Sequence, residues 1–355
     1  MPPIGQIHID TALTNLSLMY RNMAYVADQV LPIIPVAKRS DKYFTYNQAD
    51  FLSGTGLDAQ GRPFSLRAPG AEAAEVDYSL STQNYFAEEY AKRGIVTDAE
   101  VAYQDVPLQA ETDQTLQLTE QLLIDNEVAI AFMVGNTANY PTANKKQLVS
   151  GAGTNPGDSS WKSYSQTNSN PFSNIQAAKV QVISQIAREP NEMMVGLDVA
   201  RILIDHPTIK DVVKYTDPET LTPAGLPKTL RGMNIREGGA QYNTAKDGQA
   251  YSGGYVWEAQ NGSGTTYTGM ALIYYRAPAP GLRMVSFGYI FEGPDDTTGT
   301  RGLAVRRYRW EVRKGQIIEV SYMRDWRFMA TDGSTNGAWS AGLATGGYLI
   351  YDAIV

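Results

Sequence analysis

One segment constrains this sequence most: two strand patterns joined by a long tip that has too little apolar surface to pack on itself. Residues 42–47 alternate between aromatic and polar side chains, and residues 75–85 alternate again. Helix- and strand-breaking residues punctuate the tip between them: Gly54, Gly56, Gly61, Pro63, Pro69 and Gly70. We therefore expect a protruding hairpin that becomes ordered against a partner.

The first forty residues predict an apolar arm. Residues 13–20 can form a helical turn or two, but residues 30–36 cannot be helical, because Pro32 and Pro35 each remove a donor and restrict the preceding residue. We expect such an arm to lie across a surface, either its own or a neighbour's. The N-terminus lacks the basic and apolar regions of a signal peptide, and no apolar stretch is long enough to span a bilayer. We expect no membrane partner.

Residues 111–135 give the clearest helical pattern. The acidic residues Glu111 and Asp113 stand at its front, where the helix dipole favours them, and Gly135 marks its end. A helix of this length measures about 36 Å, longer than most helices of globular proteins. The side chains at helical spacing are Leu116, Leu123, Ile124, Glu127, Ile130, Ala131 and Val134.

The remaining patterns alternate between helix and strand, which is typical of an α/β region. Residues 136–172 are rich in Asn, Thr, Ser, Gly and Pro and predict a loop, which Trp161 and Tyr164 mark as ordered. Residues 303–312 and 317–327 predict a second hairpin with Gly315 in its turn. The other predicted helices cover residues 97–104, 173–188, 197–205 and 208–215, and the other strands 191–195, 255–257, 266–275, 283–291 and 346–355.

Chemistry-bearing motifs are scarce. The chain has no cysteine, which excludes disulfides, thiolate metal sites and a Cys nucleophile. Of the two histidines, His8 lies in the arm and His206 is expected to close a helix, where partial positive charge is favoured. Residues 332–337 resemble the first six positions of a calcium-binding loop. Position 12, however, is Leu343 and not the bidentate Glu that such a loop needs. We expect no catalytic, cofactor-binding or metal-binding residue, although distant carboxylates could still pair as in a glycosidase.

Residues 301–327 combine basic and aromatic side chains, including Arg306, Arg307, Arg309, Tyr308 and Trp310. One interpretation is a platform for single-stranded nucleic acid. The other is a sheet face whose arginines pair with acids on a neighbouring subunit or on the long helix. The net charge of −7 favours the second, because nucleic-acid binding needs a basic surface.

Several stretches follow one another in the chain: residues 13–16 (LTNL), 26–38 (VADQVLPIIPVAK), 42–46 (KYFTY), 67–72 (RAPGAE), 187–191 (AREPN), 205–207 (DHP), 213–215 (VKY) and 305–308 (VRRY). They are spread over residues 13–308, most of the chain. In this order, they make the chain resemble the major capsid proteins of tailed bacteriophages with the Hong Kong 97 fold.

The resemblance implies an α+β capsid fold with five parts. They are an N-terminal arm (1–41), an extended E-loop hairpin (42–90), a peripheral domain (91–172) with a spine helix at 111–135, an α/β axial domain (173–300), and peripheral strands with a C-terminal return (301–355). The last ten residues are expected to rejoin the axial domain. Inter-subunit contacts are expected at Gly54, Gly56, Gly61, Arg62, Arg67, Gly70, Arg306, Arg307, Arg309 and Trp310.

Two departures from the family pattern matter. In some members, a Lys of the E-loop forms a covalent bond with an Asn of a neighbouring subunit and so crosslinks the shell. Residues 54–70 contain no Lys, so no such crosslink is expected here. Some members carry an N-terminal scaffolding region, whereas this arm begins almost at Met1, so any scaffold is expected to be a separate protein.

The function implied is assembly of hexamers and pentamers into an icosahedral virion shell around double-stranded DNA, made in the host cytoplasm. A portal and a decoration protein are further expected partners, and DNA is enclosed non-specifically. Three alternatives stay open: an encapsulin-type nanocompartment holding cargo, a secreted β-rich carbohydrate-active enzyme, and a phage tail or decoration protein. The missing signal peptide disfavours the enzyme, and the long helix disfavours the tail protein.

Overall fold

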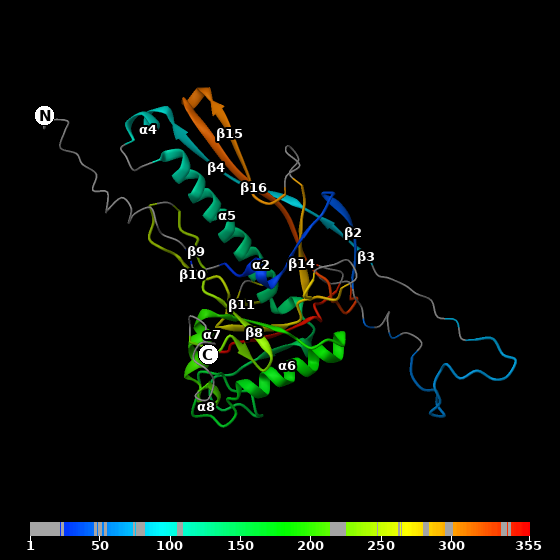
Figure 1. Cartoon of the computed structure of the whole chain (residues 1–355). Coiled ribbons are helices and arrows are strands. Elements are labelled where there is room, and N and C mark those ends of the chain that lie inside the picture. Colours follow the sequence, from blue (N-terminus) through cyan, green and yellow to red (C-terminus); the bar gives the residue numbers. More distant parts are fainter. Residues whose placement is uncertain are drawn as a thin grey trace.

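The computed structural model contains two large β-sheets; the long helix lies along the first, the second lies near the C-terminal end of that helix, and a hairpin projects far from both (Figure 1). The description covers residues 22, 25–45, 48, 52, 55–73, 75, 82–104, 109–213, 225–246, 248–261, 263, 265–279, 284–294, 301–334, 339 and 342–355. The predicted helical turn at 13–20 lies outside these residues. The predicted α+β fold class is confirmed.

The first sheet is built around one long strand, β16. The strands β15 and β4 run antiparallel to β16 on its two sides, at residues 315–321 and 315–324. The strand β14 pairs antiparallel with residues 324–328, and β1 extends the sheet in parallel with β14. The long helix α5 lies against β16 and β4 (Figure 1). The bounds are β1 Ile33–Pro35, β4 Glu88–Thr97, β14 Gly288–Glu292, β15 Ala304–Trp310, β16 Gly315–Phe328 and α5 Ala110–Gly135.

The second sheet has six strands in the order β5-β17-β13-β6-β8-β7. Its central strands β13 and β6 are buried at every position. The helix α6 packs on β17 and β13, and α7 packs on β6 and β8. The bounds are β5 Lys145–Gln147, β6 Glu192–Gly196, β7 Thr229–Leu230, β8 Met233–Gly238, β13 Met270–Tyr274, β17 Gly347–Tyr351, α6 Pro171–Ile186, α7 Leu197–Asp205 and α8 Pro207–Val213.

Smaller elements connect the sheets and form the base of the hairpin. The strands β2 and β3 pair antiparallel at the base of the projecting tip, and the two-residue or three-residue strands β9 to β12 pair beside α5 (Figure 1). Their bounds are α2 Ala27–Val30, β2 Ser40–Phe44, β3 Thr82–Phe86, α4 Asp98–Tyr103, β9 Gln241–Asn243, β10 Gly253–Tyr255, β11 Ala259–Gln260 and β12 Thr266–Tyr267; one-turn 3₁₀ helices are η1 Thr137–Asn139, η2 Thr142–Asn144 and η4 Glu311–Arg313.

The core divides into three apolar clusters. The largest lies between α5 and the first sheet and continues onto one face of the six-stranded sheet. The second lies between the other face of that sheet and the helices α6 and α7, and a small aromatic cluster lies under the hairpin base. The members of the small cluster are Tyr43, Tyr85, Tyr289, Phe291 and Met329. The described tip of the hairpin, residues 55–73, contributes to none of the three.

Most predicted helices are present, and α5 starts one residue before the predicted range. Its predicted apolar face is partly wrong, however. Leu116 is 57% exposed, whereas Leu118 and Leu122 are buried. The buried stripe runs at intervals of four through the polar Asn126, which hides it from a search for apolar side chains alone.

The second predicted hairpin is also corrected at its turn. The strand β15 ends at Trp310 and a 3₁₀ turn follows. The left-handed residue is Lys314, with φ 47°, and not Gly315, which already pairs in the sheet. Residues 256 and 257, predicted as strand, follow β10 without joining it.

Two strands show where the chain changes sheets. β5 pairs with β17 of the six-stranded sheet, and β14 pairs with β16 of the five-stranded sheet. Both lie at points where the chain crosses between the sheets. Long-range pairing, which leaves no local sequence pattern, decides where such strands belong.

Candidate functional site

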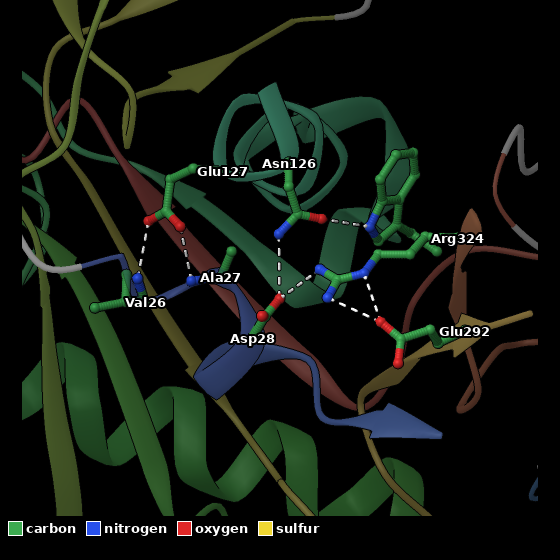
Figure 2. Close-up of polar contacts among 8 residues, drawn as sticks. Val26, Ala27, Asp28, Asn126, Glu127, Glu292 and Arg324 are labelled. Atoms are coloured by element: carbon green, nitrogen blue, oxygen red, sulfur yellow. Dashed lines mark hydrogen bonds and ion pairs between the residues drawn. The ribbon is translucent and has the colours of Figure 1, made fainter. Parts of the chain in front are cut away.

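The buried carboxylate of Glu127 fastens the arm to α5. Glu127 is 0% exposed. Its two oxygens accept hydrogen bonds from the backbone N–H groups of Val26 (3.1 Å) and Ala27 (2.9 Å) at the start of α2 (Figure 2). The indole N–H of Trp257 donates a third bond, at 2.6 Å. A buried carboxylate needs such donors, so these bonds fix where the arm crosses the helix.

The electrostatics of Glu127 reflect two opposing effects. Burial raises the pKa of this carboxyl above its ordinary value of 4.5, whereas the hydrogen bonds from Val26, Ala27 and Trp257 lower it. The nearby carboxylate of Asp28 raises the pKa further. The net direction is upward because loss of hydration outweighs the three donors.

Arg324 on β16 bonds both to the arm and to β14. The Asp28 carboxylate accepts from the Arg324 guanidinium at 3.1 Å and from the side-chain amide of Asn126 at 3.1 Å (Figure 2). The Glu292 carboxylate accepts two further bonds from Arg324, at 3.0 and 3.1 Å. The indole of Trp326 completes the network by donating to the Asn126 oxygen at 3.2 Å.

We call this set the arm anchor: Asp28, Asn126, Glu127, Trp257, Glu292, Arg324 and Trp326. It connects α2, α5, β14 and β16 at one place. Within it, Arg324 is only 6% exposed and forms ion pairs with two carboxylates, so this buried cation has charged partners. The predicted arm therefore lies, over its described part, on its own subunit, and β1 continues it into the sheet.

The hairpin base contacts the first sheet, whereas the hydrogen bonds and ion pair described for residues 55–73 join residues of the tip itself. The backbone N–H of Phe86 donates to Asp325 at 2.9 Å, and the guanidinium of Arg39 lies over the Phe86 ring. At the tip, one Asp58 oxygen accepts from the backbone N–H groups of Gln60 and Arg62. Three apolar side chains of the tip are exposed by more than half: Leu57 (62%), Phe64 (52%) and Leu66 (61%). Apolar side chains on a projecting segment mark an interaction surface.

The predicted contact residues of the tip are placed as follows. Gly56 has φ 134°, and an added Cβ would lie 3.0 Å from the Phe64 ring, so this turn needs glycine. Gly61 and Gly70 also have positive φ. Arg62 pairs with Asp58 at 3.7 Å, and Arg67 donates to the carbonyl of Ala71. Gly54 lies outside the described residues.

The predicted arginines of β15 pair with acids of their own chain. Arg306 contacts Glu89 at 3.2 Å and Glu319 at 3.3 Å. Arg307 contacts Glu111 on α5 at 2.9 Å, so the predicted pairing with the long helix is confirmed for this residue. Arg309 contacts Asp98 at 2.7 Å and, by this hydrogen bond, lowers the pKa of that carboxyl.

The aromatic residues of β15 are similarly engaged. The guanidinium groups of Arg93 and Arg313 lie 5.9 and 5.0 Å from the centre of the Trp310 ring. The Tyr308 hydroxyl donates to Glu319 at 3.1 Å. A nucleic-acid platform needs open rings and uncompensated cations. The described side chains of β15 are instead engaged with residues of their own chain.

The described residues contain neither a metal-binding cluster nor a membrane-spanning helix. No group of three or more His, Asp or Glu among them could hold a metal ion, and no described helix has the length and apolar character to cross a membrane. One Asp332 oxygen accepts from the backbone N–H groups of Ser334 and Leu343, which makes a polar turn.

Burial of His206 works against the positive charge expected of it at the end of α7. It is the residue after the last turn of α7, as predicted, but it is 2% exposed and burial lowers its pKa. Its ring nitrogens lie 3.2 Å from the Ser169 hydroxyl and 2.8 Å from the Thr208 hydroxyl. It is a buried, hydrogen-bonded residue in the packing between α7 and α8.

The sequence did not predict the arm anchor as a group of interacting residues. One signal for it existed, because Glu127 falls on the apolar stripe of the predicted helix, where a carboxylate needs buried donors. Its partners Asp28, Glu292 and Arg324 lie far away in the chain. No spacing pattern could have assembled them.

Comparison with known proteins gives sequence relatives of one kind, although no family model matches the chain. It is 30% identical over 246 residues to the major capsid protein of Pseudomonas phage JBD67, which covers 68% of this chain and 72% of that protein. It is 26% identical over 241 residues to the major capsid protein of Burkholderia phage BcepMu, which covers 67% of this chain and 71% of that protein.

Solved structures share the fold over nearly the whole chain. A phage-related protein from Bordetella bronchiseptica RB50 matches with a TM-score of 0.60 at 23% identity, covering 97% of each chain. The capsid of cyanophage P-SCSP1u matches with a TM-score of 0.55 at 10% identity, covering 94% and 89%. An encapsulin from Synechococcus elongatus matches with a TM-score of 0.51 at 12% identity, covering 97% and 95%.

Proposed function

The chain belongs to the family of bacteriophage major capsid proteins and is a structural subunit of a capsid, and we propose that its copies form hexamers and pentamers of an icosahedral shell around a double-stranded DNA genome. The observation that carries this proposal is the 30% identity to a phage capsid protein over 68% of the chain. The shared fold with the cyanophage capsid supports it independently.

The proposed division of labour follows the two sheets. The five-stranded sheet with α5 as its spine is the peripheral domain, and the six-stranded sheet with α6 and α7 is the axial domain around each hexamer or pentamer centre. In this proposal residues 1–41 form the arm and residues 42–90 form the E-loop. The arm anchor sets the angle at which the arm crosses the spine helix.

The E-loop supplies the proposed contact between neighbouring subunits. Its exposed residues Leu57, Phe64 and Leu66 gain burial only when an adjacent subunit lies beneath the tip. Contacts of a few kcal/mol each keep assembly errors reversible, while their sum holds a closed shell. With no Lys in residues 54–70, this clasp is non-covalent.

The proposed partners follow from the same role. A separate scaffolding protein, a portal and a decoration protein associate with the shell, which is made in the host cytoplasm and has no enzymatic activity. The genome is enclosed without specific contacts, in keeping with a net charge of −7 and with arginines of β15 that pair inside the subunit.

An encapsulin-type compartment is the second candidate, because an encapsulin shares the fold with a TM-score of 0.51. The contents of the shell separate the two. Shells purified from the native source should contain DNA, and a protein cargo in place of DNA would favour the encapsulin.

Electron microscopy of the recombinant chain tests the proposed function directly. We expect icosahedral shells, or rings of six and five subunits, to form from the purified protein, alone or with a co-expressed scaffold. A stable monomer at high protein concentration, under both conditions, would contradict the proposal.

A further inference from the structure

The outer face of α6 lacks the charges of an ordinary solvent-facing helix. The helix packs on the six-stranded sheet through Ile175, Ala178, Val182 and Ile186. Its opposite side, which we call the α6 outer face, consists of Gln176, Ala177, Val180, Ile183 and Ser184. Val180 is 57% exposed and Ile183 is 41% exposed.

The one charged residue of α6 points away from this face. The Lys179 side chain is 10% exposed, and its ammonium group contacts Glu189 at 2.6 Å and donates to the carbonyl of Arg231 at 2.9 Å. Other helices do carry charge on exposed positions, such as Arg201 on α7 and Asp125 on α5. Solvent-facing helix surfaces are normally charged, so an uncharged face containing Val and Ile indicates coverage by protein.

The α6 outer face adjoins the surface under the hairpin. The Gln48 side chain, where the chain runs out from β2 toward the tip, donates to the carbonyl of Ser184 at 2.9 Å. The hairpin thus leaves the body beside the C-terminal end of α6 and projects on the same side of the molecule (Figure 1). A second protein molecule that lies beneath the tip and contacts Leu57 or Phe64 can therefore also reach α6.

We propose that a second copy of this chain covers the α6 outer face in the assembled shell, as a continuation of the contact under the hairpin. The inference rests on the proposed function, because only self-assembly supplies that copy. The hairpin and α6 lie on one side of the subunit, so each subunit offers this surface to one neighbour and docks on another. Such head-to-tail contacts close into rings.

A charge placed on the face tests the proposal. Val180→Glu and Ile183→Glu, each in the full chain, are expected to reduce shell yield at least tenfold in sucrose-gradient sedimentation, with an unchanged circular dichroism spectrum of the unassembled subunit. Arg201→Glu, on an exposed position that already carries charge, is the matched control and should assemble as the wild type does. Wild-type yields from both α6 variants would overturn the proposal.

A thiol footprint gives a second readout that does not depend on tolerance of a charge. The chain contains no cysteine, so Val180→Cys and Arg201→Cys each provide a single reactive group. A maleimide should modify the Val180→Cys thiol at least tenfold more slowly in shells assembled from the chain alone than in unassembled subunits, while the Arg201→Cys thiol reacts similarly in both.

The outcomes separate this inference from the proposed function. Equal labelling of the Val180→Cys thiol in shells and in free subunits would overturn the α6 contact while leaving shell formation intact. A protection seen only in shells that still contain a scaffold would assign the face to the scaffold and overturn it too. A wild-type chain that never assembles contradicts the proposed function itself.

Discussion

At the scale of single residues, the two oxygens of Glu127 serve three N–H donors in a site without water access. In Glu127→Gln an amide NH₂ replaces one oxygen and meets a donor instead of accepting from it. We expect the free energy of unfolding to fall by about 1–3 kcal/mol, the cost of an unsatisfied buried group. Urea denaturation of the unassembled subunit, followed by tryptophan fluorescence, measures the change.

The neighbouring Asp125 provides the control for this experiment. Its side chain is 48% exposed and contacts Lys92 at 2.7 Å. Exposed ion pairs contribute less than about 1 kcal/mol, so Asp125→Asn should change the free energy of unfolding little. Equal losses in the two variants would show that the Glu127 bonds do not anchor the arm.

The burial of His206 predicts that the subunit loses stability on acidification. Because burial lowers its pKa below 6.5, the folded subunit binds fewer protons near that pH than the unfolded chain does. The contribution of His206 is therefore complete above pH 6.5 and is lost as the pH falls through the lowered pKa. In His206→Gln, urea midpoints measured on either side of pH 6.5 should show a smaller loss on acidification than in the wild type. A loss of equal size would refute this role.

Residue-level chemistry was predictable only in part. The sequence placed His206 at a helix end, but its burial depends on Ser169 and Tyr164, which come from a preceding loop. Likewise, Glu127 was on the correct face of the helix, yet its donors come from the arm and from Trp257. Periodicity gives the direction of a side chain and leaves its distant partners undetermined.

At the scale of elements, Gly315 was expected in the turn between β15 and β16, but it is the first residue of β16. Glycine is needed there for another reason, because an added Cβ would lie 2.6 Å from the backbone oxygen of Val96 on β4. Backbone cannot move aside cheaply, so Gly315→Ala should lower the free energy of unfolding by about 1–3 kcal/mol. Gly254→Ala in β10, which has no atom within 4 Å of an added Cβ, is the control in the same urea titration. No difference between the two would disprove the crowding at β4.

The hairpin tip makes the next prediction. Replacing residues 54–70 by a short Gly-Ser linker should leave the subunit folded, because the described tip contributes to no core cluster. We expect the circular dichroism spectrum to be retained and stable shells to be lost in sedimentation. A full-length variant with Leu57, Phe64 and Leu66 all changed to Ser keeps the length of the hairpin and removes only its exposed apolar side chains. Comparing it with the deletion shows whether the shell requires the length or the apolar contact. Shells that survive the deletion unchanged would show that the hairpin is not a clamp.

Elements with strong local periodicity were predictable, and those fixed by distant partners were not. The helix α7 has the predicted bounds because its buried side chains recur at helical spacing. The strand β5, a polar three-residue segment, was read as loop because it becomes a strand only by pairing with residues 349–351. The exposed Leu116 was misplaced for a related reason, since the buried stripe of α5 passes through Asn126.

At the scale of the whole molecule, the chain is acidic and the arginines of β15 form ion pairs within the subunit. The net charge is −7, and Arg306, Arg307 and Arg309 each contact a carboxylate of the same chain. Duplex DNA is bound through phosphate contacts from uncompensated Lys and Arg, and this binding weakens steeply with salt. A shell of such subunits should therefore enclose DNA without adhering to it.

Gel-retardation and co-sedimentation with opened shells test this prediction at physiological ionic strength. We expect no tight binding of duplex DNA by wild-type shells or by unassembled subunits. A variant with Glu89, Glu111 and Glu319 all changed to Gln frees the guanidinium groups of Arg306 and Arg307 and should bind DNA more strongly, with a steeper salt dependence. Tight binding by the wild type at physiological salt would mean that acidity does not keep the genome off the wall, and that basic residues outside these ion pairs hold it.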